Sequence, residues 1–184
     1  MEEKKEFKMF RTIDIVQIGL MAAVIYIVTL IFNLPYYMGV IHLGDSMVFI
    51  AALLLGSKKA TVASAIGMCL FDLLSPYAIW APFTLVIKGI MALIAASIAY
   101  RKNYNGNNIW NNAFAFTIAS IWMILGYYLG GVILSHYYFR MEWFKSFIIP
   151  LADITGNIIQ VVCGMLIALS LGTALKKAIG NRLL

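Results

Sequence analysis

Long apolar runs separated by short polar or charged segments make up most of the chain. These runs predict membrane-spanning helices at about residues 12–32, 45–56, 60–74, 82–100, 112–134 and 147–171. The second and third runs are short: at ~1.5 Å of rise per residue they barely cross a hydrocarbon layer of ~30 Å. Gly56 and the basic residues that follow it separate these two runs. The pattern predicts an all-α membrane protein, with a single domain of six transmembrane helices over residues 1–184.

The composition agrees with this class. The chain is 62% hydrophobic and 12% charged, whereas soluble domains are nearer half apolar and a quarter charged. Six helices with short loops leave no room for a nucleotide-binding domain, so another subunit or an ion gradient has to supply the energy for any transport. We therefore expect no cofactor in this chain.

The net charge of +6 follows membrane topology and does not indicate binding to nucleic acid. With six spans, one side of the membrane holds eleven of the 14 Lys and Arg residues, the other side holds two, and Lys88 lies within a span. The eleven are Lys4, Lys5, Lys8, Arg11, Lys58, Lys59, Arg101, Lys102, Lys176, Lys177 and Arg182, and the two are Arg140 and Lys145. Because cytoplasmic loops carry the excess of basic residues, this distribution predicts that both termini are cytoplasmic.

The segment between the first two spans contains prolines, glycines, tyrosines and a histidine but no Lys or Arg. We expect residues 33–45 to form an ordered loop on the non-cytoplasmic side. Asp45 closes this loop at the start of the next helix, where a carboxylate can accept hydrogen bonds from free backbone amides. We expect Asp45 to cap that helix rather than to contact a ligand.

Unusual polar side chains gather on the predicted outer side. Asp72 ends the third span there, and Lys88 lies roughly 9 Å below the outer start of the fourth. Asp153, Asn157 and Gln160 follow an i, i+4, i+7 pattern, so they share one face of the sixth helix. The candidate binding residues are Tyr37, His42, Asp72, Tyr77, Trp80, Lys88, His136, Asp153, Asn157 and Gln160.

Ionisable residues within membrane spans usually face the bundle interior and mark a substrate or ion path. A structural ion pair between Lys88 and one Asp is the alternative, and it does not exclude ligand contact. For Tyr77 and Trp80, the alternative to a pocket wall is anchoring at the membrane interface.

A pocket of rings, carboxylates, amides and an ammonium group suits a small polar aromatic solute. Enzyme chemistry has less support, since the sequence contains no zinc-protease, nucleophile-elbow or phosphate-loop motif. His42 and His136 lack the spacing of metal ligands, so no metal site is expected. Two other functions stay open: an autonomous proton-coupled carrier, and a membrane enzyme or structural subunit.

Two stretches of the sequence resemble a known family of transport proteins. Residues 41–59 (IHLGDSMVFIAALLLGSKK) are similar to the loop and second helix of substrate-binding S components of energy-coupling factor (ECF) vitamin transporters. Residues 72–77 (DLLSPY) and 80–89 (WAPFTLVIKG) resemble the same group, and its length and six-helix layout match the whole chain.

The resemblance implies a mechanism and partners. An S component in the bacterial cytoplasmic membrane binds its vitamin at the outer face, docks on a transmembrane coupling subunit that carries two ATPase subunits, and topples to release the vitamin inside. Gly19 and Ala23 match the small-residue positions of the family's docking helix, where the small side chains allow close helix approach. On spacing alone, packing within the bundle is an equal alternative for these two residues. The branch that the sequence resembles most closely implies a pyridoxine-type vitamin, next hydroxymethylpyrimidine, with riboflavin less favoured.

Overall fold

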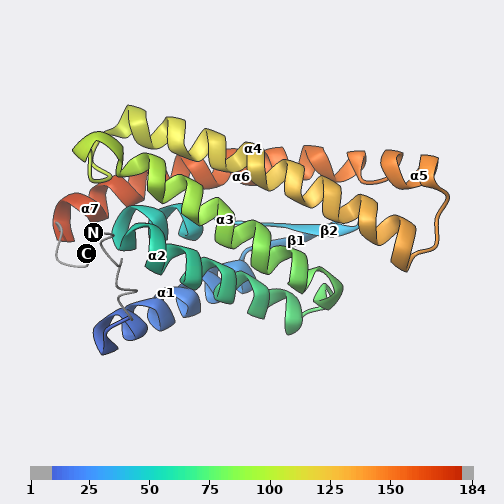
Figure 1. The fold of residues 1–184 in the computed structure, drawn as a ribbon, viewed down its shortest axis with the longest axis horizontal. Helices are drawn as coiled ribbons and strands as arrows, with labels where there is room; N and C mark the ends of the chain where they lie inside the picture. The colour runs from blue at the N-terminus through green and yellow to red at the C-terminus, as the bar shows by residue number, and fades with distance from the viewer. Residues whose placement is uncertain (1–9, 180–184) are drawn as a thin grey trace, which may run out of the picture.

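The computed structural model describes residues 10–179 as a bundle of long helices with one small β-hairpin (Figure 1). The elements are α1 (Thr12–Ile31), β1 (Asn33–Tyr36), β2 (Gly39–His42), α2 (Gly44–Leu73), η1 (Ala78–Trp80), α3 (Ala81–Ala99), η2 (Arg101–Asn103), α4 (Ile109–Ile133), η3 (Leu134–Tyr138), α5 (Trp143–Ile148), α6 (Leu151–Ile167), η4 (Ala168–Gly172) and α7 (Thr173–Ile179). By length and composition, five of the described helices could cross a membrane: Thr12–Ile31, Gly44–Leu73, Ala78–Ala99, Ile109–Tyr138 and Trp143–Ile179. This result confirms the general part of the prediction, that the protein is largely helical and contains long apolar helices of membrane-spanning length.

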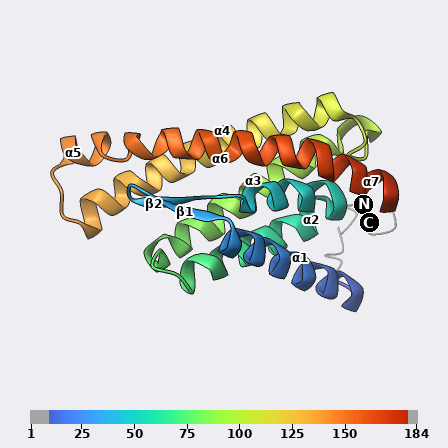
Figure 2. The ribbon, with the colours of Figure 1, turned by 180° about the vertical axis from the view of Figure 1, so that it is seen from behind.

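The second of these helices bends sharply at Gly56. Gly56 has φ 71° and ψ 178°, a left-handed backbone conformation that glycine adopts at little cost. The chain reverses direction there, so the two parts of α2 on either side of Gly56 run back along each other (Figures 1 and 2). The sequence predicted a break over residues 56–59, whereas helical structure resumes directly after Gly56.

The segment predicted as an ordered loop forms an antiparallel β-hairpin. Asn33 pairs with His42 and Tyr36 pairs with Gly39, leaving Tyr37 and Met38 at the turn. The hairpin connects α1 to α2 and lies beside α6 (Figure 2).

The predicted loop over residues 135–146 is largely helical. A π-helical turn, η3, extends α4 to Tyr138, and α5 begins at Trp143. The predicted sixth span, residues 147–171, begins four residues after the start of α5 and ends before the end of α7. Pro150 lies between α5 and α6, where its missing N–H interrupts the helix.

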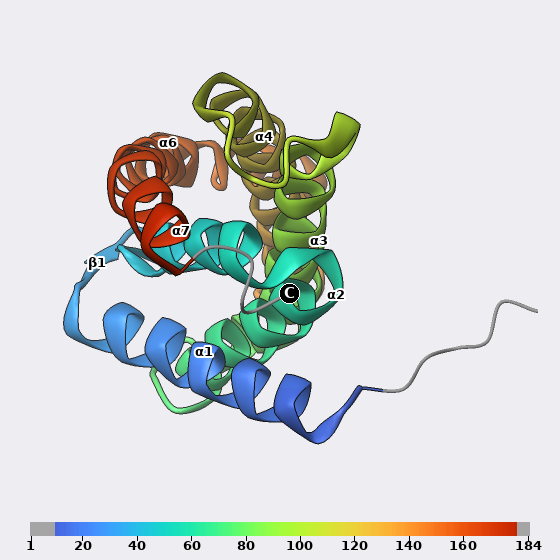
Figure 3. The same cartoon turned by 90° about the vertical axis from the view of Figure 1, so that its left-hand side faces the viewer.

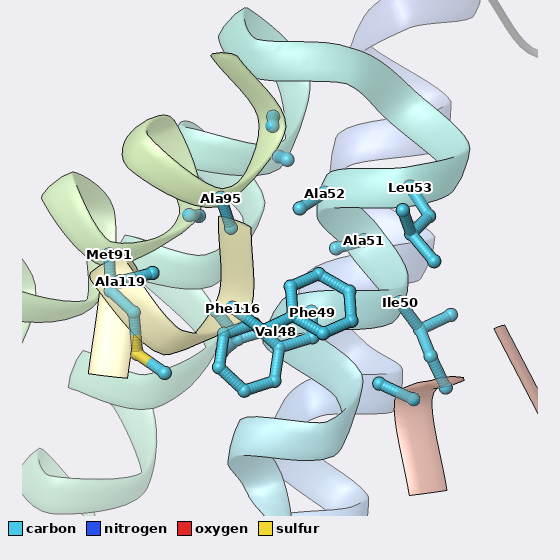
Figure 4. Packing of buried hydrophobic residues seen from close by; sticks show 14 of the residues in the cluster. Val48, Phe49, Ile50, Ala51, Ala52, Leu53, Met91, Ala95, Phe116 and Ala119 are labelled. Carbon is cyan, nitrogen blue, oxygen red and sulfur yellow. The ribbon is translucent and has the colours of Figure 1, made fainter. Parts of the chain in front are cut away.

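The first part of α2 is the centre of the hydrophobic core. Every residue from Val48 to Leu55 is buried, as expected for a helix that is apolar on all sides. The Phe49 ring stacks on Phe116 of α4 with centroids 4.3 Å apart (Figure 4). Figure 3, seen along the bundle, shows this segment surrounded by α1, α3, α4 and α6. Because this segment is packed on all sides, the core fixes the orientation of the polar side chains near the start of α2.

The two ends of the described chain lie at the same end of the bundle. The beginning of α1 and the end of α7 both lie at one end, and the tip of the hairpin and α5 lie toward the other (Figure 1). Polar side chains from distant parts of the sequence gather beneath the hairpin.

Candidate functional site

A cavity lies between the hairpin and the helices that it covers. The space open to the centre of a water molecule is about 40 Å³, enough to hold ordered water. Its lining consists of Tyr36, Gly39, Val40, Ile41, His42, Asp72, Tyr77, Trp80, Thr84, Tyr127, Asp153, Gly156, Asn157 and Gln160. Aromatic rings and hydrogen-bonding side chains therefore face the same small space.

Three hydrogen bonds fasten the hairpin over this cavity. The Trp80 indole donates from Nε1 to the Met38 carbonyl at 3.0 Å, and the Met38 N–H donates to Asp153 Oδ1 at 3.3 Å. The His42 N–H donates to Gln160 Oε1 at 3.0 Å. The hairpin is thus held at its turn and at the end of β2, from η1 on one side and α6 on the other.

Gly156 allows the hairpin to lie directly on α6. A Cβ atom at this position would lie 2.7 Å from a ring carbon of Tyr36 and 3.1 Å from Ile41. Any larger residue would push β1 and β2 away from the helix. The close approach brings the hairpin within reach of the Asp153 and Gln160 side chains.

A buried ion pair lies next to the cavity. Lys88 Nζ of α3 donates a hydrogen bond to Asp45 Oδ1 of α2, and both side chains are completely inaccessible to solvent. Gln160 Nε2 donates to the other Asp45 oxygen at 2.7 Å. The Tyr127 ring centroid is 5.2 Å from Lys88 Nζ. A chain of polar contacts therefore runs from Lys88 through Asp45 and Gln160 to the backbone of β2.

This ion pair corrects the sequence interpretation of Asp45. The residue before α2 is Leu43, no side chain caps this helix, and the Asp45 carboxylate binds Lys88 and Gln160. The structural-ion-pair alternative for Lys88 thus holds, with Asp45 as the partner instead of Asp72 or Asp153. Asp45 was missed as a site residue, although a lone carboxylate in the first turn of an apolar helix was the available signal.

Two buried polar atoms in the lining have no hydrogen-bond partner within the part of the chain that is described. They are Oδ2 of Asp72 and Nδ1 of His42. Both residues are only 5% exposed. Buried polar atoms in native proteins nearly always have a partner in the protein or in ordered water, so these two atoms are available to a water or to a molecule bound in the cavity.

The structure brings seven of the ten predicted binding residues together in the lining: His42, Asp72, Tyr77, Trp80, Asp153, Asn157 and Gln160. Lys88 is next to the cavity but outside its lining. Tyr37 is 76% exposed at the hairpin turn, and its neighbour Tyr36 faces the cavity instead. His136 lies within η3, where its ring stacks on Trp143 of α5 with ring centroids 3.7 Å apart.

Sequence reasoning also missed Tyr36, Thr84 and Tyr127. The Thr84 and Tyr127 hydroxyls are hydrogen-bonded to each other at 3.0 Å across α3 and α4. Thr84 lies one helical turn before Lys88, a spacing that could have placed it on the same face. No sequence signal distinguished Tyr127 from the other aromatic residues of its helix.

Gly19 and Ala23 lie on the exposed side of α1. A Cβ atom added at Gly19 would meet nothing within 4 Å. The packed side of α1 consists of Ile18, Ala22, Ile25 and Thr29. Within residues 10–179 nothing packs closely on Gly19, and Ala23 is exposed, so both positions lie outside the helix contacts of the described bundle.

His42 gives the site a testable pH dependence. Burial lowers the pKa of His42 from 6.5 to about 4, because the charged imidazolium loses its water. The unfolded chain therefore binds a proton more readily than the folded protein between these values, and stability falls as the pH drops from 6.5 toward 4. The loss attributable to His42 amounts to about 3 kcal/mol.

Thermal unfolding in detergent over this pH range measures the effect. His42→Gln should lose less stability than the unmodified protein on acidification, whereas His136→Gln should behave like the unmodified protein. Equal losses in all three proteins would contradict a buried neutral His42.

No group of three or more His, Cys, Asp or Glu residues within residues 10–179 could hold a metal ion. The site is thus one of hydrogen-bonding and aromatic groups under a fastened hairpin.

Comparison with known proteins places the chain in a family. A Pyrococcus woesei protein described as "Uncharacterized protein in gap 3'region" is 28% identical over 152 residues, which cover 80% of this chain and 89% of the relative. The family described as "ECF-type riboflavin transporter, S component" matches residues 9–177. The chain belongs to this family of ECF transporter S components.

Proposed function

We propose that this chain captures a small hydroxylated heterocycle at the outer face of the membrane and delivers it by docking on an ECF coupling subunit with two ATPase subunits. Family membership makes the chain a multi-pass membrane transport protein, a substrate-binding subunit and not an enzyme. The observation that carries the proposal is the cavity beneath the hairpin, which combines aromatic walls with hydrogen-bonding atoms that lack partners.

The size of the cavity favours a one-ring vitamin. The family description names riboflavin, a compound with three fused rings and a long polyol chain. With only about 40 Å³ open to the centre of a water molecule, the cavity has to expand less for pyridoxine or hydroxymethylpyrimidine than for riboflavin. We propose a pyridoxine-type vitamin as the substrate, with hydroxymethylpyrimidine next and riboflavin third.

The topology that we propose has six crossings and both termini in the cytoplasm. The reversal at Gly56 supports it, since the two parts of α2 then cross separately, if shallowly. The described chain begins and ends at the same end of the bundle, as an even number of crossings requires. The cavity then opens on the outer side, away from most of the basic residues.

A binding experiment tests the proposal directly. The purified chain in detergent is titrated with pyridoxine, hydroxymethylpyrimidine and riboflavin without ATP, by calorimetry and by tryptophan fluorescence. We expect one of the one-ring compounds to bind and to change the emission, with Trp80→Phe reducing the change because Trp80 lines the cavity. Binding of riboflavin alone would replace the substrate but keep the S-component role. Binding of none of the three would remove the proposal.

Transport separates this function from an autonomous carrier. We expect liposomes that contain only this chain to show no uptake, and liposomes that also contain the coupling subunit and ATPases to show ATP-dependent uptake. Uptake by this chain alone, abolished by an uncoupler, would favour the proton-coupled carrier.

The exposed stripe of α1 that contains Gly19 and Ala23 is the docking surface that we propose. Gly19→Leu should leave vitamin binding unchanged, because nothing within residues 10–179 packs against this position. It should block assembly with the coupling subunit, because the added side chain prevents close helix contact. Co-purification with the coupling module measures assembly.

Val24→Phe is the matched control for Gly19→Leu. It adds as many carbon atoms at another exposed position of α1, about 140° away around the helix. We expect this variant to assemble normally. Assembly of Gly19→Leu at the same level as Val24→Phe would move the docking surface elsewhere.

A further inference from the structure

The charged side chains in the cavity lining are all negative. Within the described residues, Asp72 and Asp153 are the lining residues with a formal charge, and no Lys or Arg faces the same space. The nearest ammonium group, that of Lys88, is paired with Asp45 and fully buried. His42 is uncharged near neutral pH because burial lowers its pKa to about 4. A ligand in the cavity therefore meets two carboxylates and no exposed cation.

Asp72 has an oxygen atom prepared to accept a hydrogen bond. It is 5% exposed, lines the cavity, and its Oδ2 atom has no hydrogen-bond partner in the part of the chain that the structure describes. The Tyr77 ring also lines the cavity and stacks on Phe71 with ring centroids 6.4 Å apart, so part of the cavity wall is aromatic. An unpartnered buried carboxylate oxygen is costly, and a donor group on a bound ring compound would relieve that cost.

Asp153 lies elsewhere in the cavity lining and, like Asp72, carries a negative charge. Its Oδ1 atom accepts from the Met38 N–H of the hairpin turn. This single long hydrogen bond leaves acceptor capacity on a carboxylate, which can accept several. A ligand that donates on this side would strengthen the closure of the hairpin, and an anionic ligand would be repelled by the group that holds the hairpin closed.

From this geometry we infer that the cavity selects neutral or cationic ring compounds with hydrogen-bond donors and rejects their phosphate esters and other anions, with Asp72 as the residue that determines this selectivity. The inference rests on the proposed function and specifies the charge of its substrate class. Sites that bind phosphate present Arg, Lys or free backbone amides to it, and the lining here presents carboxylates. The protein would therefore import the free vitamin, and any phosphorylated form would have to be hydrolysed by a phosphatase outside the cell before capture.

The experiment compares an alcohol with its own phosphate ester. The full chain in detergent is titrated with pyridoxine and pyridoxine 5′-phosphate, and in parallel with hydroxymethylpyrimidine and its phosphate ester and with riboflavin and riboflavin 5′-phosphate. Within each pair the ring is the same, so the affinity ratio reports the charge. We expect the unmodified protein to bind the alcohol of one pair at least about tenfold more tightly than its ester, since a like charge in a poorly hydrated site is strongly disfavoured.

Asp72→Asn keeps the shape of the side chain and removes its charge. We expect it to weaken binding of the alcohol by about tenfold, because a hydrogen bond to a charged acceptor becomes a neutral one. We also expect the affinities for alcohol and ester to become more similar. In the double variant, Asp72→Asn with Asp153→Asn, the two affinities should be closer still. Glu142→Gln, at an exposed position of the α4–α5 connection, is the control and should leave both affinities unchanged.

The outcomes distinguish this inference from the proposed function. Equal affinity of the unmodified protein for alcohol and ester would overturn the inference and leave the S-component role intact. An unchanged ratio in Asp72→Asn, with a normal melting temperature, would overturn the role of Asp72. Failure to bind any of the three alcohols would overturn the proposed function and, with it, the inference. The affinity ratio between alcohol and ester in the unmodified protein tests the charge selectivity of the cavity even if a variant fails to fold.

Discussion

Lys88→Met should destabilise the protein more than any other single substitution near the cavity. The substitution leaves the Asp45 carboxylate buried without its counter-charge, since both side chains are inaccessible to solvent. Removal of one partner of a buried ion pair costs about 3–5 kcal/mol. In a protein of this size that corresponds to a fall in Tm of roughly 10 °C, which thermal unfolding in detergent can measure.

Two further variants test whether the loss of stability comes from the uncompensated charge of Asp45. Lys88→Met combined with Asp45→Leu replaces both charged groups by apolar ones, and we expect it to recover most of the lost stability. Lys145→Met removes a cation from an exposed pair with Glu142, and we expect a change below about 1 kcal/mol. A Lys88→Met protein as stable as Lys145→Met would show that the buried pair does not stabilise the fold.

Gln160→Met should have the second-largest effect, because it loosens the hairpin. Gln160 is 2% exposed and connects the His42 N–H of β2 to Asp45 of α2. Methionine fills a similar volume but cannot replace either hydrogen bond, so two buried polar groups lose a partner at a cost of roughly 1–3 kcal/mol each. Hydrogen exchange of the β2 amides should rise and ligand binding should weaken, since the hairpin is fastened at one place fewer.

Asn157→Leu is the comparison for Gln160→Met. Asn157 faces the same cavity from the same helix, and no hydrogen bond joins it to the hairpin among the described residues. We expect this variant to change ligand affinity but to leave the exchange of the β2 amides and the Tm nearly unchanged. If both variants alter exchange equally, Gln160 does not act as a fastener of the hairpin.

The polar residues in and beside the apolar runs were the most informative part of the sequence. Asp72, Asp153, Asn157 and Gln160 were predicted to face a common space because hydrocarbon disfavours them, and the structure does place them around one cavity. The helical spacing of the last three sufficed to put them on one face. Their assignment as ligand contacts stays a prediction until binding is measured.

Tyr36 and Tyr37 show where sequence reasoning failed. Successive residues of a strand point to opposite faces, so a shift of one position reverses which tyrosine faces the cavity. The segment was expected to be a loop, for which no such alternation applies. Its pairing as a hairpin, with Tyr36 packed on Gly156 of α6, depends on contact with a helix far along the chain.

The sequence by itself determined the class of the protein, the presence of long helices and the set of polar residues that hydrocarbon disfavours. Those properties follow from the length of helix that spans a bilayer and from the cost of polar groups inside it, which are local features of the chain. Only the tertiary structure decided that Asp45 pairs with Lys88, that Gln160 joins this pair to the hairpin, and that Asp72 keeps an oxygen free. These contacts connect α2, α3, α6 and β2, and the packing of the helices against one another sets which of several possible partners each charge meets.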